Sequence, residues 1–196
     1  MSRDDRVFSA DVQRVDLTEF TPDGRILDIG GGGEGIIGQL LGDRVVAIDT
    51  GRDELAKAPE GPLKIVMDAR EMGFLNTSFD AVTSFFTLMY IERRHHQRVF
   101  DEVYRVLKDG GVFTIWDARI PRYPGGAKDI FVVPLEVRLA DKLVSTAYGV
   151  LWRDAEQDMK YYVEMGKRAG FDILTTEEMG EAFRIQLGKP VRACSA

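Results

Sequence analysis

Cysteine is almost absent from this chain of 196 residues, in which Cys194 stands alone. One cysteine excludes an intramolecular disulfide and any metal cluster built on cysteine ligands, and it fits a reducing compartment. Only two histidines occur, no motif suggests a metal site, and no apolar run approaches the ~18 residues of a membrane span. Residues 1–6 are charged, with no apolar stretch behind them. We therefore expect a cytoplasmic protein with no membrane association.

An excess of positive charge is also lacking. The chain has 26 basic and 32 acidic residues and a net charge of −6, so nucleic acid is not an expected partner. Its 44% hydrophobic and 30% charged residues are typical of a globular protein. The length fits one domain over residues 1–196, with no linker or internal repeat.

The most informative segment runs from Ile26 to Gly35. Apolar residues lead through Asp28 into four glycines, and residues 36–41 then read as a helix. Glycines there can adopt positive φ and let a ligand approach the backbone, while the first N–H groups of a helix point at the same place. This strand, tight turn and helix predict a nucleotide-like ligand.

Strand and helix patterns alternate along most of the chain, which predicts an α/β fold with a mostly parallel sheet. Apolar periodicity and turn residues set the expected boundaries. We expect strands at 25–29, 44–48, 63–67, 79–86 and 112–116, helices at 34–41, 51–58, 92–107 and 155–169, and a closing antiparallel pair at 171–175 and 181–187.

Two ligands fit the glycine turn. Gly30, Gly32 and Gly35 satisfy the dinucleotide pattern G-x-G-x-x-G. Asp49 comes directly after the second strand and lies about 20 residues past the end of the first strand, as this pattern requires. S-adenosylmethionine also needs a close backbone approach and an acid for its ribose. Because it carries a positive sulfonium and an amino group, it tolerates the charge of Asp28. The turn by itself leaves both ligands open.

Four further segments follow in order: Val46–Asp49, Met67–Ala69, Ser78–Ser84 and Arg105–Gly111. Together with the glycine turn they resemble the motifs of class I S-adenosylmethionine-dependent methyltransferases, especially the small-molecule branch typified by ubiquinone- and menaquinone-biosynthesis enzymes. The resemblance covers roughly residues 24–112, with a fainter match at the C-terminus. It implies a Rossmann-like sheet of seven mostly parallel strands with the last one antiparallel, and S-adenosyl-L-methionine as cofactor.

The resemblance also implies roles for individual residues. Asp28 would face the sulfonium end, Asp49 would hold the ribose, and Asp68 with Ala69 would contact adenine. The full set implied to bind the cofactor is Asp28, Gly30, Gly31, Gly32, Asp49, Thr50, Asp68, Ala69, Ser84 and Phe85. For Asp28 and Asp68 the alternative is local capping of a turn, and for Phe85 it is a place in the core. The chain departs from the family at Glu34, where the motif's last glycine is expected, and at Asp109, where proline is usual.

The implied reaction is methyl transfer to a small-molecule acceptor by in-line displacement. If the acceptor must lose a proton, a base is needed within reach. Candidates near the carboxyl ends of the fourth and fifth strands are Tyr90, His95, His96 and Asp117. The alternatives are a catalytically silent protein that binds S-adenosylmethionine or a partner, and an NAD-dependent oxidoreductase.

Residues 118–153 read as an insert after the fifth strand, with a β-hairpin formed by 130–139 and 143–152. Its aromatic residues, Tyr123, Phe131, Tyr148 and Trp152, suit the walls of a small-molecule pocket. A hairpin alone is marginally stable, so it must pack on something. We expect it to cover the acceptor pocket or to form a homodimer through its open edge; the alternative is that it extends the sheet or core.

Overall fold

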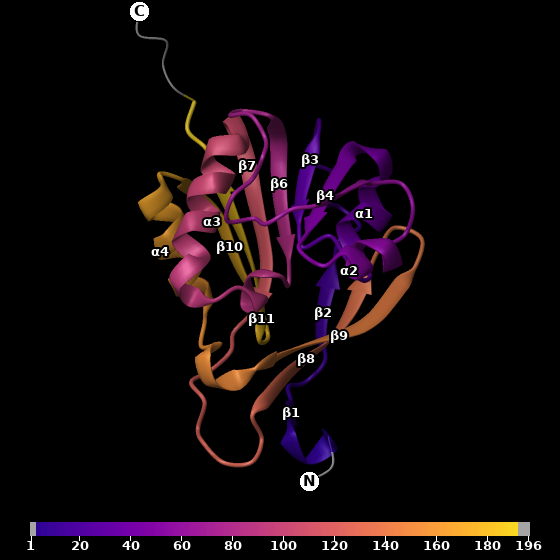
Figure 1. The fold of residues 1–196 in the computed structure, drawn as a ribbon, viewed down its shortest axis with the longest axis vertical. Coiled ribbons are helices and arrows are strands. Elements are labelled where there is room, and N and C mark those ends of the chain that lie inside the picture. Colours follow the sequence, from indigo (N-terminus) through magenta and orange to yellow (C-terminus); the bar gives the residue numbers. More distant parts are fainter. Residues whose placement is uncertain (1–2, 192–196) are drawn as a thin grey trace, which may run out of the picture.

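The computed structural model describes residues 3–191, and Cys194 lies outside them. Its main element is a seven-stranded sheet (Figure 1). In spatial order the strands are β10 (Asp172–Met179), β11 (Ala182–Gly188), β7 (Leu107–Ala118), β6 (Phe79–Phe85), β3 (Ile26–Ile29), β4 (Val45–Asp49) and β5 (Leu63–Val66). β11 is antiparallel to both of its neighbours, and the other pairs are parallel. The predicted sheet is confirmed.

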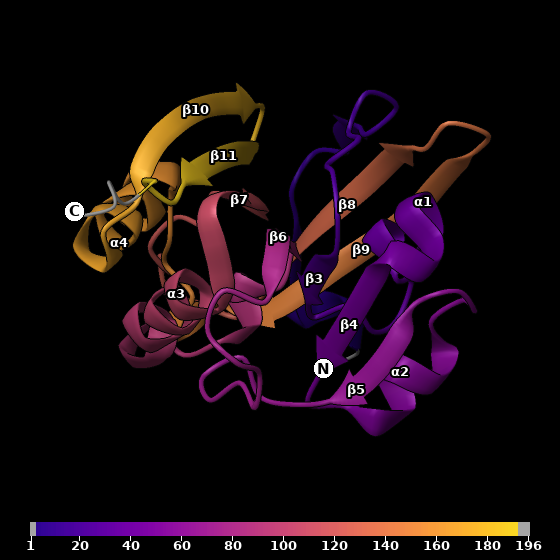
Figure 2. The same ribbon diagram turned by 90° about the horizontal axis from the view of Figure 1, so that it is seen from above.

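Helices cover both faces of this sheet (Figure 2). They are α1 (Ile36–Leu41), α2 (Arg52–Lys57), α3 (Arg93–Val106) and α4 (Met159–Ala169), with short 3₁₀ turns at Arg3–Arg6, Gly42–Arg44, Leu88–Tyr90 and Trp152–Asp154. Successive strand residues face opposite sides, so Ile26 packs with α1 while Leu27 packs with α3 and α4. The buried strands therefore feed two separate cores. Within residues 3–191, no helix is long and apolar enough to cross a membrane.

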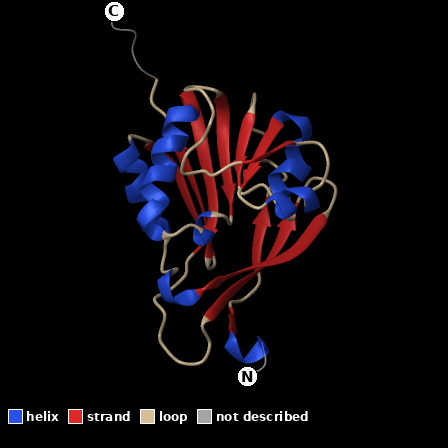
Figure 3. Ribbon diagram, viewed as in Figure 1, coloured by secondary structure: helices blue, strands red, loops and turns tan. Residues whose placement is uncertain are grey.

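A second, smaller sheet lies beside the first (Figure 3). Its strands are β1 (Val7–Ser9), β2 (Gln13–Asp16), β8 (Ile130–Arg138) and β9 (Leu143–Leu151). β8 and β9 form the predicted hairpin, with ends within one residue of those expected. β1 and β2 follow each other along the opposite edge of β8, parallel to it, and were not predicted. Both edges of β8 are thus used, and pairing of β9 with a second subunit stays a prediction.

Three boundaries differ by four or more residues from those expected. α4 begins at Met159 and not at residue 155, because Asp158 caps it by accepting a hydrogen bond from the Tyr161 N–H at 2.7 Å. β7 begins five residues early, directly after α3, with an irregular register opposite the start of β6. β10 extends to Met179 because Gly180, at a φ of 72°, makes a tight turn into β11.

The small sheet is tied to the large one by a buried amide. The Gln13 side-chain oxygen accepts hydrogen bonds from the N–H groups of Glu181 at 2.7 Å and Ala182 at 3.2 Å. Gln13→Leu keeps a similar volume but leaves both donors without this acceptor. We expect it to lower the free energy of unfolding by about 1–3 kcal/mol in urea titration.

Arg14→Leu is the matched control for that variant. Arg14 is the next residue of β2, and its pair with Glu136 is exposed, so its loss should cost at most about 1 kcal/mol. Equal destabilisation by the two variants would contradict a tie through Gln13.

Candidate functional site

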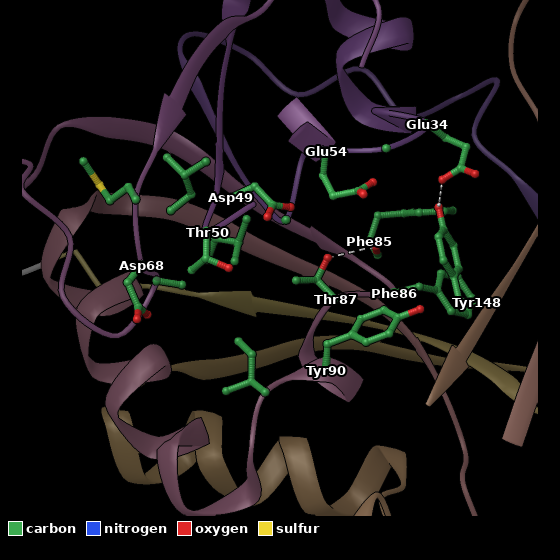
Figure 4. A pocket seen from close by; sticks show the side chains of 18 of the residues that line it. Glu34, Asp49, Thr50, Glu54, Asp68, Phe85, Phe86, Thr87, Tyr90 and Tyr148 are labelled. Carbon is green, nitrogen blue, oxygen red and sulfur yellow. Dashed lines mark hydrogen bonds between the residues drawn. The ribbon is translucent and has the colours of Figure 1, made fainter. Parts of the chain in front are cut away.

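A cavity of about 590 Å³ opens at the carboxyl ends of β3, β4 and β6 (Figure 4). This volume is typical of small-molecule sites. The cavity is lined by the glycine loop, the ends of β4 and β6, the loop after β5, the turn before α3 and part of β9, namely Ile29, Gly30, Gly32, Gly33, Glu34, Ile48, Asp49, Thr50, Glu54, Met67, Asp68, Ala69, Arg70, Phe85, Phe86, Thr87, Tyr90, Ile91, Glu92, Ala147 and Tyr148.

The glycine loop is pressed against its neighbours. The N–H groups of Gly30 and Gly31 both donate to the Ile48 carbonyl, at 2.8 and 3.1 Å. Gly30 has a φ of 74°, and a Cβ there would overlap the Thr87 side chain. A Cβ on Gly32 would lie 2.8 Å from Asp49 Oδ2. Backbone and not side chain therefore forms this wall of the cavity, as a closely held ligand requires.

The helix after the loop starts later than predicted. Gly35 adopts a left-handed conformation, with a φ of 54°, so α1 begins at Ile36 and not at Glu34. Glu34 thus belongs to the loop, and its side chain is free to turn toward the cavity. The one signal of this in the sequence is the departure from glycine at position 34.

One half of the cavity carries acids at strand ends. Asp49 is the last residue of β4, and its Oδ1 accepts a hydrogen bond from the Gly51 N–H at 2.7 Å. Asp68 follows β5 and caps its own turn, because Oδ1 accepts from the Arg70 N–H at 2.8 Å. The Arg70 guanidinium pairs with the same carboxylate at 2.6 Å and holds the pKa of Asp68 low. The expected cap at Asp68 is present, and the side chain also lies at the cavity.

The other half of the cavity is aromatic. Phe85 and Phe86 come from the end of β6, Tyr90 from the turn before α3, and Tyr148 from β9. The Phe86 and Tyr148 rings stack with centroids 5.7 Å apart. Figure 4 shows Tyr148 reaching Glu34, to which its hydroxyl donates at 3.3 Å. The sequence predicts separate roles for these residues, with Phe85 and Phe86 as cofactor wall or core, Tyr90 as a candidate base and Tyr148 as a pocket wall, and it does not assign Glu34 to the pocket.

Three residues predicted to bind the cofactor lie behind the cavity wall. Asp28 is buried beneath the glycine loop, where its Oδ1 accepts a hydrogen bond from the Thr83 hydroxyl at 2.7 Å. Gly31 packs on Ala47, and Ser84 is buried in β6 with no hydrogen-bond partner for its hydroxyl among the described atoms. The predicted residues that do line the cavity are Gly30, Gly32, Asp49, Thr50, Asp68, Ala69 and Phe85.

Of the four candidate bases, the structure brings Tyr90 alone to the cavity. His95 lies in the first turn of α3, outside the lining. His96 is buried and bonded on both ring nitrogens, to the Tyr161 hydroxyl and the Leu88 carbonyl, each at 3.0 Å. Asp117 is buried and accepts from Gln157 Nε2 at 2.7 Å. His96 and Asp117 therefore belong to the packed interior.

Most aromatic residues of the insert face the small sheet. The Trp152 ring packs on Phe131, Phe8 and Tyr123, with centroid distances of 4.9, 5.0 and 5.8 Å. Tyr148 is the one member of the expected set that lines the cavity. The difference arises because Phe131 and Trp152 belong to the buried core that the hairpin shares with α1 and β7.

The cavity is strongly acidic. Glu34, Asp49, Glu54, Asp68 and Glu92 line it, and Arg70 is the single basic side chain in that lining. Arg70 pairs with Asp68, and two basic residues outside the lining, Lys57 and Arg94, pair with Glu54 and Glu92. The charge of Glu34 and Asp49 is what favours a cationic ligand. Across residues 3–191, His, Cys, Asp and Glu form no group of three or more that could hold a metal ion.

Comparison with known proteins gives a consistent class. Residues 27–115 match the family model described as a methyltransferase domain. The chain is 25% identical over 187 residues to sterol methyltransferase-like 1 of Botryococcus braunii, which covers 86% of this chain and 43% of that protein. The chain thus spans less than half the length of this curated relative.

Solved structures share the fold. An S-adenosylmethionine-dependent methyltransferase of Methanosarcina mazei has a TM-score of 0.65 at 19% identity, covering 91% of this chain and 100% of that one. The [4+2]-cyclase SpnF has a TM-score of 0.65 at 15% identity, covering 89% and 78%. Residues 27–115 match a methyltransferase domain and the chain shares the fold of S-adenosylmethionine-dependent methyltransferases, which supports a place in class I of that family. The ubiquinone- and menaquinone-type branch stays a prediction.

The buried acids predict a pH dependence of stability. Burial raises the pKa of Asp28 and of Asp117 to about 7, above the ~3.9 of an unfolded chain. The folded state therefore holds these protons longer, so their contribution is complete below about pH 4 and is lost as pH rises toward 7. Asp28→Asn removes one of the two titrations. We expect a smaller fall in unfolding free energy between about pH 4.5 and about pH 8, measured in urea.

Asp43→Asn, at an exposed acid in the turn after α1, controls for the loss of one negative charge. An unchanged fall in the Asp28→Asn protein would show that Asp28 does not titrate in this range.

Proposed function

We propose that this chain transfers a methyl group from S-adenosylmethionine to a small-molecule acceptor bound in the aromatic half of the cavity. One observation carries the proposal. The side-chain-free wall at Gly30 and Gly32 stands beside Asp49, within a cavity whose unpaired charges are negative. Such a cradle fits a cationic nucleoside with a vicinal diol, and the family match supports the same ligand.

The residues around the cradle fit the parts of that cofactor. The Asp49 carboxylate offers acceptors for two ribose hydroxyls. Ile48, Met67 and Ala69 provide an apolar wall for the adenine ring beside Asp68. When bound, the cofactor supplies an activated methyl group on a sulfonium centre. The protein contributes orientation, which can be worth about 7–11 kcal/mol of a barrier.

The acceptor would lie between the glycine loop and β9. Phe86, Tyr90 and Tyr148 form its walls, and Tyr90 has a hydroxyl in that space. Because orientation supplies much of the acceleration, no strong base is required there unless the acceptor must lose a proton in the rate-limiting step. In that case Tyr90, Tyr148 and Glu34 are the titratable side chains on this side of the cavity.

The electrostatics disfavour an NAD-dependent oxidoreductase. The pyrophosphate of NAD is anionic and would meet Asp49, Glu54 and Glu34 in a lining whose single arginine is already paired. A silent binding protein is the remaining alternative. The fold does not decide this point, since a protein named as a cyclase shares it.

Calorimetric titration tests the cofactor assignment. We expect S-adenosylhomocysteine and S-adenosylmethionine to bind and NAD to give no heat. Turnover of radiolabelled S-adenosylmethionine with any acceptor would then separate an enzyme from a silent binder. Tight NAD binding without a response to S-adenosylhomocysteine would overturn the proposal.

Asp49→Ala should weaken binding of S-adenosylhomocysteine by about 1.5–3 kcal/mol, the range for hydrogen bonds to a charged group. Asp53→Ala is the matched control, because Asp53 is an exposed acid on α2, outside the cavity lining. Unchanged affinity in the Asp49 variant would remove this residue from the site.

A further inference from the structure

Glu34 is placed to define the acceptor end of the cavity. It stands in the loop that contacts the cofactor side, yet its carboxylate points to the hairpin. Oε1 accepts a hydrogen bond from the Thr146 hydroxyl at 2.8 Å, and Oε2 accepts from the Tyr148 hydroxyl at 3.3 Å. Each carboxylate oxygen can accept a further hydrogen bond. A charged acceptor group is thus held in place by residues more than 100 positions away.

The side chains around Glu34 form an aromatic enclosure. The Phe86 and Tyr148 rings are stacked, and the Tyr90 hydroxyl accepts a hydrogen bond from the Gly149 N–H at 3.2 Å. Burial and the neighbouring Glu34 raise the pKa of Tyr148, so its phenol stays protonated and keeps donating to the carboxylate. The Tyr90 hydroxyl retains its own proton as a donor.

The carboxylates near this enclosure belong to Glu34 and Glu54, and the Lys57 ammonium pairs with Glu54 at 2.6 Å. Asp68, which pairs with Arg70, lies at the other end of the cavity (Figure 4). An ammonium group gains from a carboxylate and from aromatic faces together. A carboxylate or phosphate on the acceptor would meet like charges and no free basic group of this lining.

We propose that the aromatic half of the cavity binds an acceptor with an apolar body and an amine, and that Glu34 recognises the amine in its protonated form. The proposal rests on the function proposed above and adds the acceptor's chemical class. Glu34 here is a specificity residue, and its negative charge offsets a second positive charge beside the cofactor.

The first experiment uses the unaltered protein saturated with S-adenosylhomocysteine. Three probes of similar size are titrated by calorimetry: 2-phenylethylamine, 2-phenylethanol and 3-phenylpropionate. We expect the amine to bind about tenfold more tightly than the alcohol, and the acid to bind most weakly, as for one charge-assisted hydrogen bond. An alcohol or an acid that binds as tightly as the amine would overturn the proposal.

The second experiment compares Glu34→Gln with Glu60→Gln. Glu60 has a side chain that is 99% exposed and lies outside the cavity lining, so this variant matches the change in net charge. We expect Glu34→Gln to lose the preference for the amine and Glu60→Gln to keep it. Both should bind S-adenosylhomocysteine with unchanged affinity.

If Glu34→Gln lowers the affinity for S-adenosylhomocysteine by the same factor as the affinity for the amine, Glu34 acts on the cofactor and the proposal is overturned. Failure of the unaltered protein to bind S-adenosylhomocysteine would instead overturn the proposed function. If Glu34→Gln does not fold, the three-probe comparison on the unaltered protein still decides the acceptor class.

Discussion

The absence of side chains at Gly31 and Gly32 is the constraint on which the site depends. A Cβ on Gly31 would lie 2.7 Å from Ala47 Cβ, and one on Gly32 would lie 2.8 Å from Glu54 Cβ. The loop after β3 can therefore rest on β4 and α2 and share the Ile48 carbonyl between two N–H groups. This contact brings Asp49 to the loop and leaves backbone exposed at the cavity. A larger residue at either glycine would push the loop away from the acid that faces it.

The small sheet completes the cavity from the other side. β8 and β9 alone would form a marginally stable hairpin. β1 and β2 stabilise it by pairing with the other edge of β8 in the same sheet. Gln13 then bonds this sheet to the start of β11. The wall that β9 presents to the cavity is thus supported from the N-terminal segment. Closure of the site depends on residues that lie far from it in the chain.

Sequence patterns predicted the parallel core well, because apolar strands such as Phe79–Phe85 are buried on both faces and carry an unambiguous signal. They did not predict β1, whose three residues have little pattern of their own and gain strand geometry by pairing with β8. The strand-end acids Asp49 and Asp68 do line the cavity, and their contact with a cofactor stays a prediction. Asp117 also stands at the end of an apolar strand, yet it is buried. Its hydrogen-bond donor, Gln157, comes 40 residues later in the chain and folds back against it. Local sequence cannot contain that partner.

The two buried candidate bases, Asp117 and His96, have a structural role that explains why polar residues stand at these positions. Asp117 Oδ2 accepts a hydrogen bond from the Met89 N–H at 3.2 Å, and His96 Nε2 bonds the Leu88 carbonyl. Burial lowers the pKa of His96, and its neutral ring can donate to that carbonyl while accepting from the Tyr161 hydroxyl. Both side chains therefore hydrogen-bond to the backbone of the turn that ends in Tyr90. A contact between a side chain and a bound ligand loses much of its effect when it shifts by about 1 Å. By holding the turn in place, His96 and Asp117 keep Tyr90 in position at the cavity, although neither residue lines it.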